Sequence, residues 1–183
     1  AERKVSISPG NVKMGKVFSV SLPPIKSCGA GLPCYKGCYA AKMARFRSVV
    51  ADAWENNWKM VTTDRAEFFR QITTFLLKKK PEMFRWHVSG DIPDLIYLNT
   101  VNVVAKMADT TTFLLFTKKY DLLRLFKREG IKRSENLSIV VSAWPGMYIP
   151  PDIRKAYPIA WMHDPKNPDK RIPEDAHVCK GDC

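Results

Sequence analysis

The order of β-rich and helical stretches constrains the fold of this chain more than any other feature of the sequence. Strands are expected over residues 17–24, 83–91, 111–119, 136–144 and 158–164, where β-branched and aromatic residues precede turn residues. Amphipathic helices are expected between them, over residues 40–60, 64–80, 93–107 and 120–130. This alternation predicts an α/β fold with a mostly parallel sheet and helical crossovers. Because such crossovers are right-handed, the strands would curl in one direction, as in a partial TIM-like barrel.

The chain is expected to form a single domain over residues 1–183, which is long enough to bury a sizeable core. In parallel α/β folds, functional groups gather at the carboxyl ends of the strands. The segments that follow the four main strands are the cysteine loop 25–40, Ser89-Gly90-Asp91, Thr117-Lys118, and Ser142-Ala143-Trp144. We expect these four segments to lie on one rim.

Five cysteines are the most distinctive chemical feature of the chain. Cys28, Cys34 and Cys38 lie within eleven residues of the loop, and Cys179 and Cys183 lie in the C-terminal tail 174–183. No secretory signal or membrane-spanning run is visible, so we expect a cytoplasmic protein without membrane attachment, whose thiols stay reduced. An odd number of cysteines also argues against a set of disulfides.

Three interpretations of the cysteines remain open. An iron–sulfur (4Fe–4S) cluster suits three thiolates supplied by one glycine-rich loop. Zinc would take Cys34, Cys38, Cys179 and Cys183, with His177 as a substitute ligand, and would leave Cys28 unused. In the third interpretation the cysteines are buried apolar thiols without a ligand.

The chain is strongly basic, with a formal net charge of +12. This charge favours an anionic partner, and nucleic acid is the first candidate. The basic clusters lie at the boundaries of elements, so the excess is expected to be spread over the surface. A zinc-stabilised basic protein that binds nucleic acid is therefore the alternative to an iron–sulfur protein.

Several single residues carry weaker expectations. His87 is expected to be a hydrogen-bonded core residue. Trp144 lies beyond a strand end and is a candidate for ligand binding. Arg45 and Arg47 follow the cysteine loop and either meet an anionic ligand or form a solvated helix face.

The stretches SLPPIKSCGAGLPCYKGCYAAK, RWHVSGD, FLLFTKK and NLSIVVS resemble the phage and mobile-element family known as gene product eighty-eight. A looser resemblance is to radical SAM enzymes, which carry three cysteines after the first strand of a partial TIM barrel. That resemblance implies a 4Fe–4S cluster on Cys28, Cys34 and Cys38, with S-adenosylmethionine (SAM) beside Ser89, Gly90 and Asp91. The gaps of five and three residues between the cysteines differ from the three and two of that class. Cys179 or Cys183 would supply a fourth ligand in a cluster without an open iron.

The sequence therefore predicts an iron–sulfur cluster-binding protein of phage or mobile-element origin, possessing radical SAM-like chemistry if it is an enzyme. It identifies no substrate.

Overall fold

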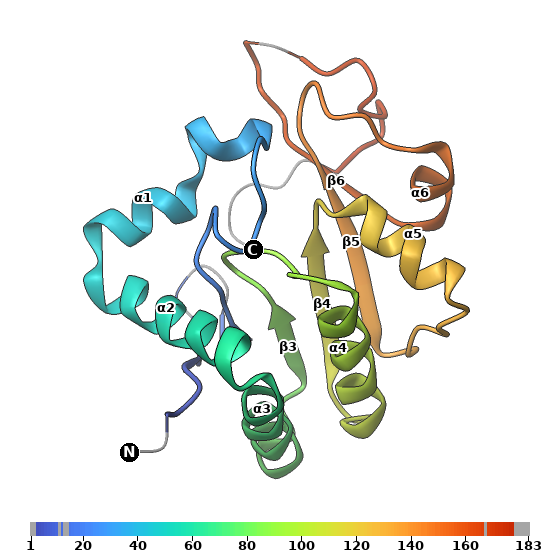
Figure 1. Ribbon diagram of the computed structural model, residues 1–183. Coiled ribbons are helices and arrows are strands. Elements are labelled where there is room, and N and C mark those ends of the chain that lie inside the picture. The colour runs from blue at the N-terminus through green and yellow to red at the C-terminus, as the bar shows by residue number, and fades with distance from the viewer. Residues whose placement is uncertain (1–2, 11, 13–14, 167, 178–183) are drawn as a thin grey trace.

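The computed structural model describes residues 3–10, 12, 15–166 and 168–177, and its strands form one sheet in the order β1-β2-β3-β4-β5-β6 (Figure 1). β1 pairs antiparallel with β2, and the other four pairings are parallel. The predicted α/β class and mostly parallel sheet are confirmed. The strands are β1 (Ile7–Ser8), β2 (Phe18–Val20), β3 (Met83–Trp86), β4 (Thr112–Thr117), β5 (Leu137–Ala143) and β6 (Ile159–Trp161).

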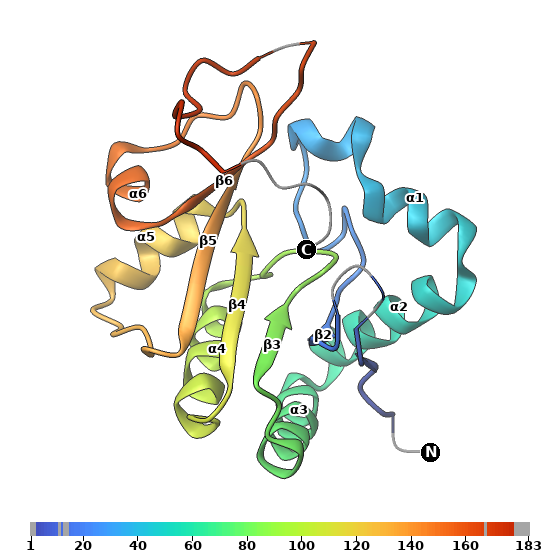
Figure 2. The same ribbon diagram turned by 180° about the vertical axis from the view of Figure 1, so that it is seen from behind.

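The helices that connect the parallel strands lie on one face of the sheet. Figure 1 shows α3 and α4 in front of the strands, and Figure 2 shows the opposite face, over which the described residues place no helix. A strand order that follows the sequence, with right-handed crossovers, puts the helices on the same side, as in a segment of a barrel. The helices are α1 (Tyr39–Phe46), α2 (Ser48–Thr63), α3 (Arg65–Lys79), α4 (Leu95–Met107), α5 (Tyr120–Arg128) and α6 (Pro151–Ala156), with a 3₁₀ helix, η1 (Pro33–Gly37).

The two faces of the sheet differ in burial, as the period of two in a strand requires. Along β5, Leu137, Ile139 and Val141 are buried against the helices, whereas Ser138 and Val140 on the other face are exposed or half-buried. In β3, Phe84 and Trp86 face the helices and Arg85 faces the other side, where its guanidinium lies over the ring of Phe116 on β4. The hydrophobic core therefore lies between the sheet and α3, α4 and α5.

Several predicted boundaries were wrong. The helix expected over residues 40–60 is two helices, because Arg47 adopts an extended conformation (φ −133°, ψ 90°) between them. β2 ends at Val20 and β3 at Trp86, so the segments that follow these strands are longer than predicted. β1 and α6 were not predicted.

The predicted helix starts at Asp64 and Asp94 are confirmed by N-caps. The side chain of Asp64 accepts a hydrogen bond from the backbone N–H of Glu67 at 3.2 Å, and that of Asp94 from Tyr97 at 2.9 Å. Each cap satisfies a backbone donor that the first turn of its helix leaves without a partner. In the part of the chain that the structure describes, no helix has the length and apolar character needed to cross a membrane.

His87 is a core residue, as predicted. It is 3% exposed, and its Nε2 atom lies 2.8 Å from the hydroxyl of Tyr97. The ring packs among the aromatic side chains of Trp86 and Tyr97. Burial, together with the positive charges of Arg85 and Lys119, lowers the pKa of His87 to about 3. His87 is therefore neutral in the folded protein at physiological pH.

The burial of neutral His87 predicts a loss of stability in acid. The unfolded chain takes up a proton near the ordinary pKa of histidine, whereas the folded chain does so near 3, so stability falls as pH falls through this range. At about pH 4.5 the loss from this group should be on the order of 2 kcal/mol. Urea unfolding at a series of pH values should show a smaller acid loss in His87→Gln than in the unsubstituted protein. His163→Gln, which removes a surface imidazole, should leave the loss unchanged, and an equal loss in His87→Gln would contradict the assignment.

Candidate functional site

The four predicted segments meet at the carboxyl ends of the parallel strands. Lys119, beyond β4, donates a hydrogen bond from Nζ to the carbonyl oxygen of Ser27 at 2.8 Å. The hydroxyl of Tyr120 donates to the carbonyl of Ser142 on β5 at 2.6 Å. The backbone N–H of Leu22 donates to the carbonyl of Ser89 at 3.0 Å. The predicted rim is thus a connected structure.

The carboxylate of Asp91 joins the end of β3 to the end of β4. Its Oδ1 atom accepts from Thr117 Oγ1 at 2.6 Å and from the backbone N–H of Ile92 at 2.7 Å, and its Oδ2 atom accepts from the N–H of Lys118 at 2.9 Å. Burial raises the pKa of Asp91, whereas these hydrogen bonds and the charge of Lys118 lower it. Three donors directed at two oxygens are the arrangement that a carboxylate accepts.

Ser27 connects this carboxylate to the cysteine loop. The backbone N–H of Asp91 donates to Ser27 Oγ at 3.1 Å, and Ser27 Oγ donates to the carbonyl of Pro23 at 2.8 Å. Ser27 is buried, and it immediately precedes Cys28. The start of the cysteine loop is therefore held at both its side chain and its carbonyl oxygen.

Gly90 allows the loop to approach the turn after β3. Its φ is +85°, and a Cβ atom at this position would lie 2.4 Å from Ser27 Oγ and 2.8 Å from the carbonyl oxygen of Leu22. The left-handed conformation and the close approach each require glycine.

The cysteine loop brings Cys34 within electrostatic reach of both Cys28 and Cys38. Cys34 is buried, whereas Cys28 and Cys38 are half-buried. Burial raises the pKa of the Cys28 and Cys34 thiols, the charge of Lys118 lowers it, and Asp91 and neighbouring thiols raise it further. Both thiols are therefore protonated at neutral pH until a ligand that prefers thiolate displaces the proton.

Tyr35 is in electrostatic reach of the same three thiols. Its hydroxyl oxygen is buried and has no hydrogen-bond partner among the described residues. Burial, and then the charges of Cys28, Cys34 and Cys38, raise the pKa of Tyr35, so the hydroxyl stays a donor. A buried donor without a partner is uncommon and calls for an explanation.

The described residues contain no group of three or more His, Cys, Asp or Glu side chains arranged to hold a metal ion. Cys179 and Cys183 lie outside the described residues, so the structure does not place these two predicted ligands. His177 is described and is exposed.

Ser89, Gly90 and Asp91, the predicted SAM-binding residues, lie beneath the start of the cysteine loop. Ser89 is 2% exposed, and its hydroxyl has no partner in the described part of the chain. The carboxylate of Asp91 is engaged by its three protein donors. Asp91 is thus a positioning residue in this structure, and SAM binding by this turn stays a prediction.

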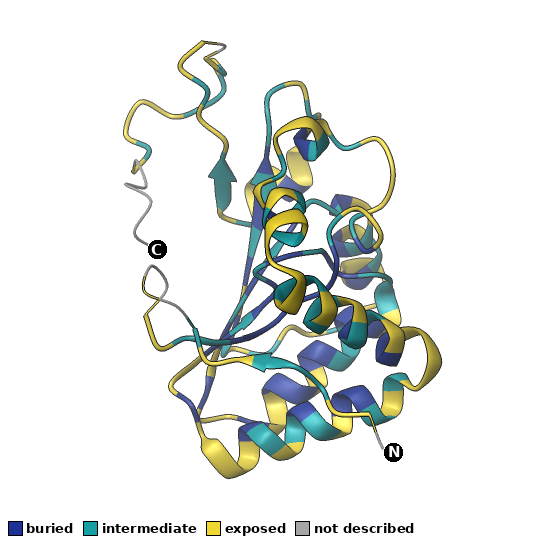
Figure 3. Cartoon of the chain, turned by 90° about the vertical axis from the view of Figure 1, so that its left-hand side faces the viewer, coloured by how far each residue is buried: buried dark blue, intermediate teal, exposed yellow. Residues whose placement is uncertain are grey.

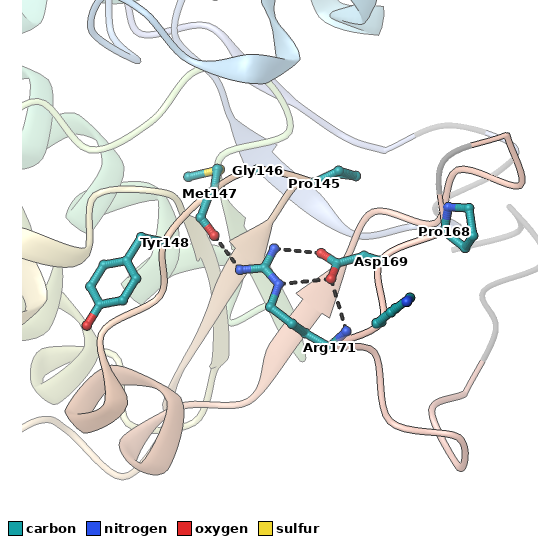
Figure 4. Close-up of a pocket in the computed structure, with 8 residues that line it drawn as sticks. Pro145, Gly146, Met147, Tyr148, Pro168, Asp169 and Arg171 are labelled. Atoms are coloured by element: carbon teal, nitrogen blue, oxygen red, sulfur yellow. Dashed lines mark hydrogen bonds and ion pairs between the residues drawn. The ribbon is translucent and has the colours of Figure 1, made fainter.

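A cavity of about 400 Å³ lies beyond β5, and the predicted binding residue Trp144 immediately precedes the first residue of its lining, Pro145. The guanidinium of Arg171 donates hydrogen bonds to the carbonyl oxygens of Trp144 and Met147. It also pairs with the carboxylate of Asp169, with N–O distances of 2.8 and 2.6 Å (Figure 4). The hydrogen bonds from Arg171 lower the pKa of Asp169. The guanidinium of Arg171 also lies over the ring of Trp161 on β6. These contacts of Arg171 hold residues 169–171 against the end of β5. The residues that line the cavity include Pro145, Gly146, Met147, Tyr148, Pro168 and Arg171.

A second cavity opens beyond β4. It has a volume of about 440 Å³ and is lined by residues that include Lys118, Tyr120 and Tyr148. Lys118, which lines this cavity, is also in electrostatic reach of Cys28 and Cys34.

The sequence analysis missed Ser27 and Lys119 as residues of the site. Both lie in stretches that carry the family resemblance, but their roles depend on hydrogen bonds across long sequence separations. The sequence analysis assigned no role to Tyr35. Its place within electrostatic reach of three thiols depends on the 3₁₀ turn η1, which the sequence did not indicate.

Comparisons with known proteins agree with the first of the two resemblances. A sequence model of the family described as Gene product 88 matches residues 2–170. The Gene 88 protein of Mycobacterium phage L5 is 26% identical over 148 aligned residues, covering 74% of this chain and 61% of that protein. The chain thus spans about three-fifths of the length of that curated relative. No solved structure matches the chain significantly, and these comparisons lend no support to the resemblance to radical SAM enzymes.

Substitutions at two glycines with similar φ values distinguish the cost of a left-handed backbone from the cost of a steric clash. Gly90 and Gly146 have φ values of +85° and +83°, but a Cβ atom on Gly146 would meet nothing within 4 Å. Gly146→Ala should cost about 1 kcal/mol for the left-handed backbone alone. Gly90→Ala should cost about 3 kcal/mol or more, because the added methyl also displaces Ser27 and Leu22. Urea unfolding of both variants measures the difference, and equal costs would show that the contact is not tight.

Proposed function

The chain belongs to the Gene product 88 family, and we propose that it binds an iron–sulfur cluster through Cys28, Cys34 and Cys38. The observation that carries the proposal is the buried Tyr35 hydroxyl, which has no partner among the described residues and lies in electrostatic reach of all three thiols. A donor in this position fits the sulfur atoms of a cluster, which accept hydrogen bonds from the protein.

The loop supplies the chemistry that such a cluster needs. Three thiols come from one segment, and the charge of Lys118 favours the thiolate forms of Cys28 and Cys34. Ser27, held by Asp91 and Lys119, fixes the start of the segment. The cluster would supply electron transfer or an open iron, and the protein residues hold it and donate hydrogen bonds to it.

The number of ligands bears on the choice between zinc and a cluster. One zinc ion is usually held by four protein ligands. The cysteine loop supplies three thiols, so a structural zinc site would need a ligand from outside the loop. Three thiols from one loop suit a cluster with one iron left open or held by a distant residue.

Iron, sulfide and zinc analysis with a visible spectrum, on protein purified without oxygen, tests the proposal. We expect a brown protein with about four irons and four sulfides per chain. Cys28→Ser, Cys34→Ser and Cys38→Ser should each lose most of the iron, whereas a surface substitution such as Ser48→Ala should retain it. A loss of iron in Cys179→Ser or Cys183→Ser would show that the tail contributes a ligand. Roughly eight irons per chain would indicate a second cluster. Colourless protein with one tightly held zinc would overturn the proposal in favour of the zinc-stabilised nucleic-acid-binding protein.

SAM binding is a separate proposal, and the buried Ser89 hydroxyl without a described partner favours it. Ser89 lies beside the loop, since its carbonyl accepts from Leu22 at 3.0 Å. We expect titration calorimetry of reconstituted protein with SAM to give saturable heat that Ser89→Ala weakens about tenfold, the effect of one lost buried hydrogen bond. Ser48→Ala, an exposed serine on α2, is the control. No heat with cluster-loaded protein would overturn SAM binding and leave the cluster proposal standing.

A further inference from the structure

The positive charge of the chain is concentrated in its N-terminal part. No acidic residue occurs between residues 3 and 51. This finding corrects the expectation that the basic excess is spread over the whole surface. The segment contains nine basic residues: Arg3, Lys4, Lys13, Lys16, Lys26, Lys36, Lys42, Arg45 and Arg47.

The end of this segment forms a projecting corner, residues 39–49, where α1 meets α2; we call it the α1–α2 corner. Figure 3 views the molecule from the side of these two helices. Phe46 is 86% exposed, Val49 79% and Tyr39 56%. Arg47, whose extended backbone separates the helices, lies at the turn itself. Large apolar side chains with this exposure contribute nothing to the core.

Aromatic and basic side chains share one face of α1. Tyr39, Lys42 and Phe46 are spaced three and four residues apart, so they lie on the same side of the helix. All three are exposed, whereas Ala40 on the other side is buried. About two helical turns separate the two rings, and a positive charge lies between them.

The basic residues of the corner are available to a partner. Within the described residues, Lys42, Arg45 and Arg47 form no ion pair within 4 Å. The nearest acid along the chain is Asp52, one turn into α2. The corner is thus a patch of uncompensated positive charge around exposed aromatic rings.

We propose that the α1–α2 corner binds single-stranded nucleic acid. Lys42, Arg45 and Arg47 contact the phosphates, and a base stacks on the ring of Phe46. This combination of backbone charge and aromatic stacking is how proteins hold single strands without regard to sequence.

The composition of the corner distinguishes this partner from a membrane. A helix that lies in a bilayer surface separates a continuous apolar face from its polar face. On α1 the charge of Lys42 lies between the two aromatic rings, so no continuous apolar face forms. Duplex DNA offers phosphates but no free base faces to Phe46.

A groove beside the corner extends the surface. It has a volume of about 220 Å³ and lies between the cysteine loop, α1 and α2, with Arg45 and Trp54 in its wall. Its lining also includes Pro23, Pro24 and Ile25 at the start of the cysteine loop. Glu55 lines it too, and its carboxylate is paired with Lys26 at 2.7 Å. A strand bound at the corner therefore passes next to the loop. The binding does not depend on the cluster, because no cysteine contributes to it.

Fluorescence anisotropy with a labelled oligothymidine of about 20 nucleotides, at about 50 to 200 mM salt, tests the proposal. The double variant Arg45→Gln/Arg47→Gln should weaken binding about tenfold or more at the lower salt. It should also reduce the slope of log K against log salt by about 1.4, the contribution of two phosphate contacts on a single strand. Phe46→Ala should weaken binding about fivefold or more and leave the slope unchanged.

Matched variants elsewhere on the surface provide the controls. Lys78→Gln/Lys79→Gln removes the same charge from the exposed end of α3, which precedes β3 at the other end of the sheet. Ile96→Ala removes a side chain that is 71% exposed on α4. Both should bind as the unsubstituted protein does, and circular dichroism checks that every variant is folded.

Three outcomes would overturn the proposal: no binding of the oligonucleotide, equal losses in the α3 control and in the corner variant, or undiminished binding by Phe46→Ala. Tighter binding to a duplex of the same length would likewise overturn it. The cysteine variants separate this result from the cluster proposal, because a Cys→Ser protein without iron should still bind the oligonucleotide.

Discussion

The buried carboxylate of Asp91 is the interaction on which the rest of the rim depends. It accepts hydrogen bonds from Thr117 and Lys118 beyond β4, and the backbone of the same residue donates to Ser27. Removing such a group would leave several buried donors without partners, each at a cost of about 1–3 kcal/mol. One residue, through its carboxylate and its backbone N–H, thus ties two strand ends to the residue that precedes Cys28.

The residues of the rim divide into those that support the site and those that could contact a ligand. Asp91, Ser27 and Lys119 are buried or engaged with protein atoms, so they form the support of the site. The groups left for a ligand are the thiols, the hydroxyls of Tyr35 and Ser89, and the cation of Lys118. The one-sided packing of the helices adds to this arrangement, because it leaves the other sheet face with Arg85 and Phe116 uncovered by any described helix.

The cysteine loop and the basic corner are consecutive in the chain. Cys38 immediately precedes α1, the helix that carries Tyr39 and Lys42. The proposed cluster and the proposed nucleic-acid surface are therefore neighbours in the chain, although they use different residues. Membership of the Gene product 88 family indicates no chemistry by itself, so the argument for either activity comes from these side chains.

The sequence by itself determined the α/β class, the parallel pairing, the caps at Asp64 and Asp94, the burial of His87 and the gathering of four segments at one rim. These properties depend on local patterns: the period of hydrophobic residues, the side chains at helix starts, and the general rule for strand ends. Only the tertiary structure decided that Gly90 lies against Ser27, that Asp91 is an anchor within the protein, that Tyr35 lies within electrostatic reach of three thiols, and that Arg47 turns the chain to expose Phe46. Each of these depends on contacts between distant segments or on one backbone torsion, and neither leaves a periodic signal in the sequence.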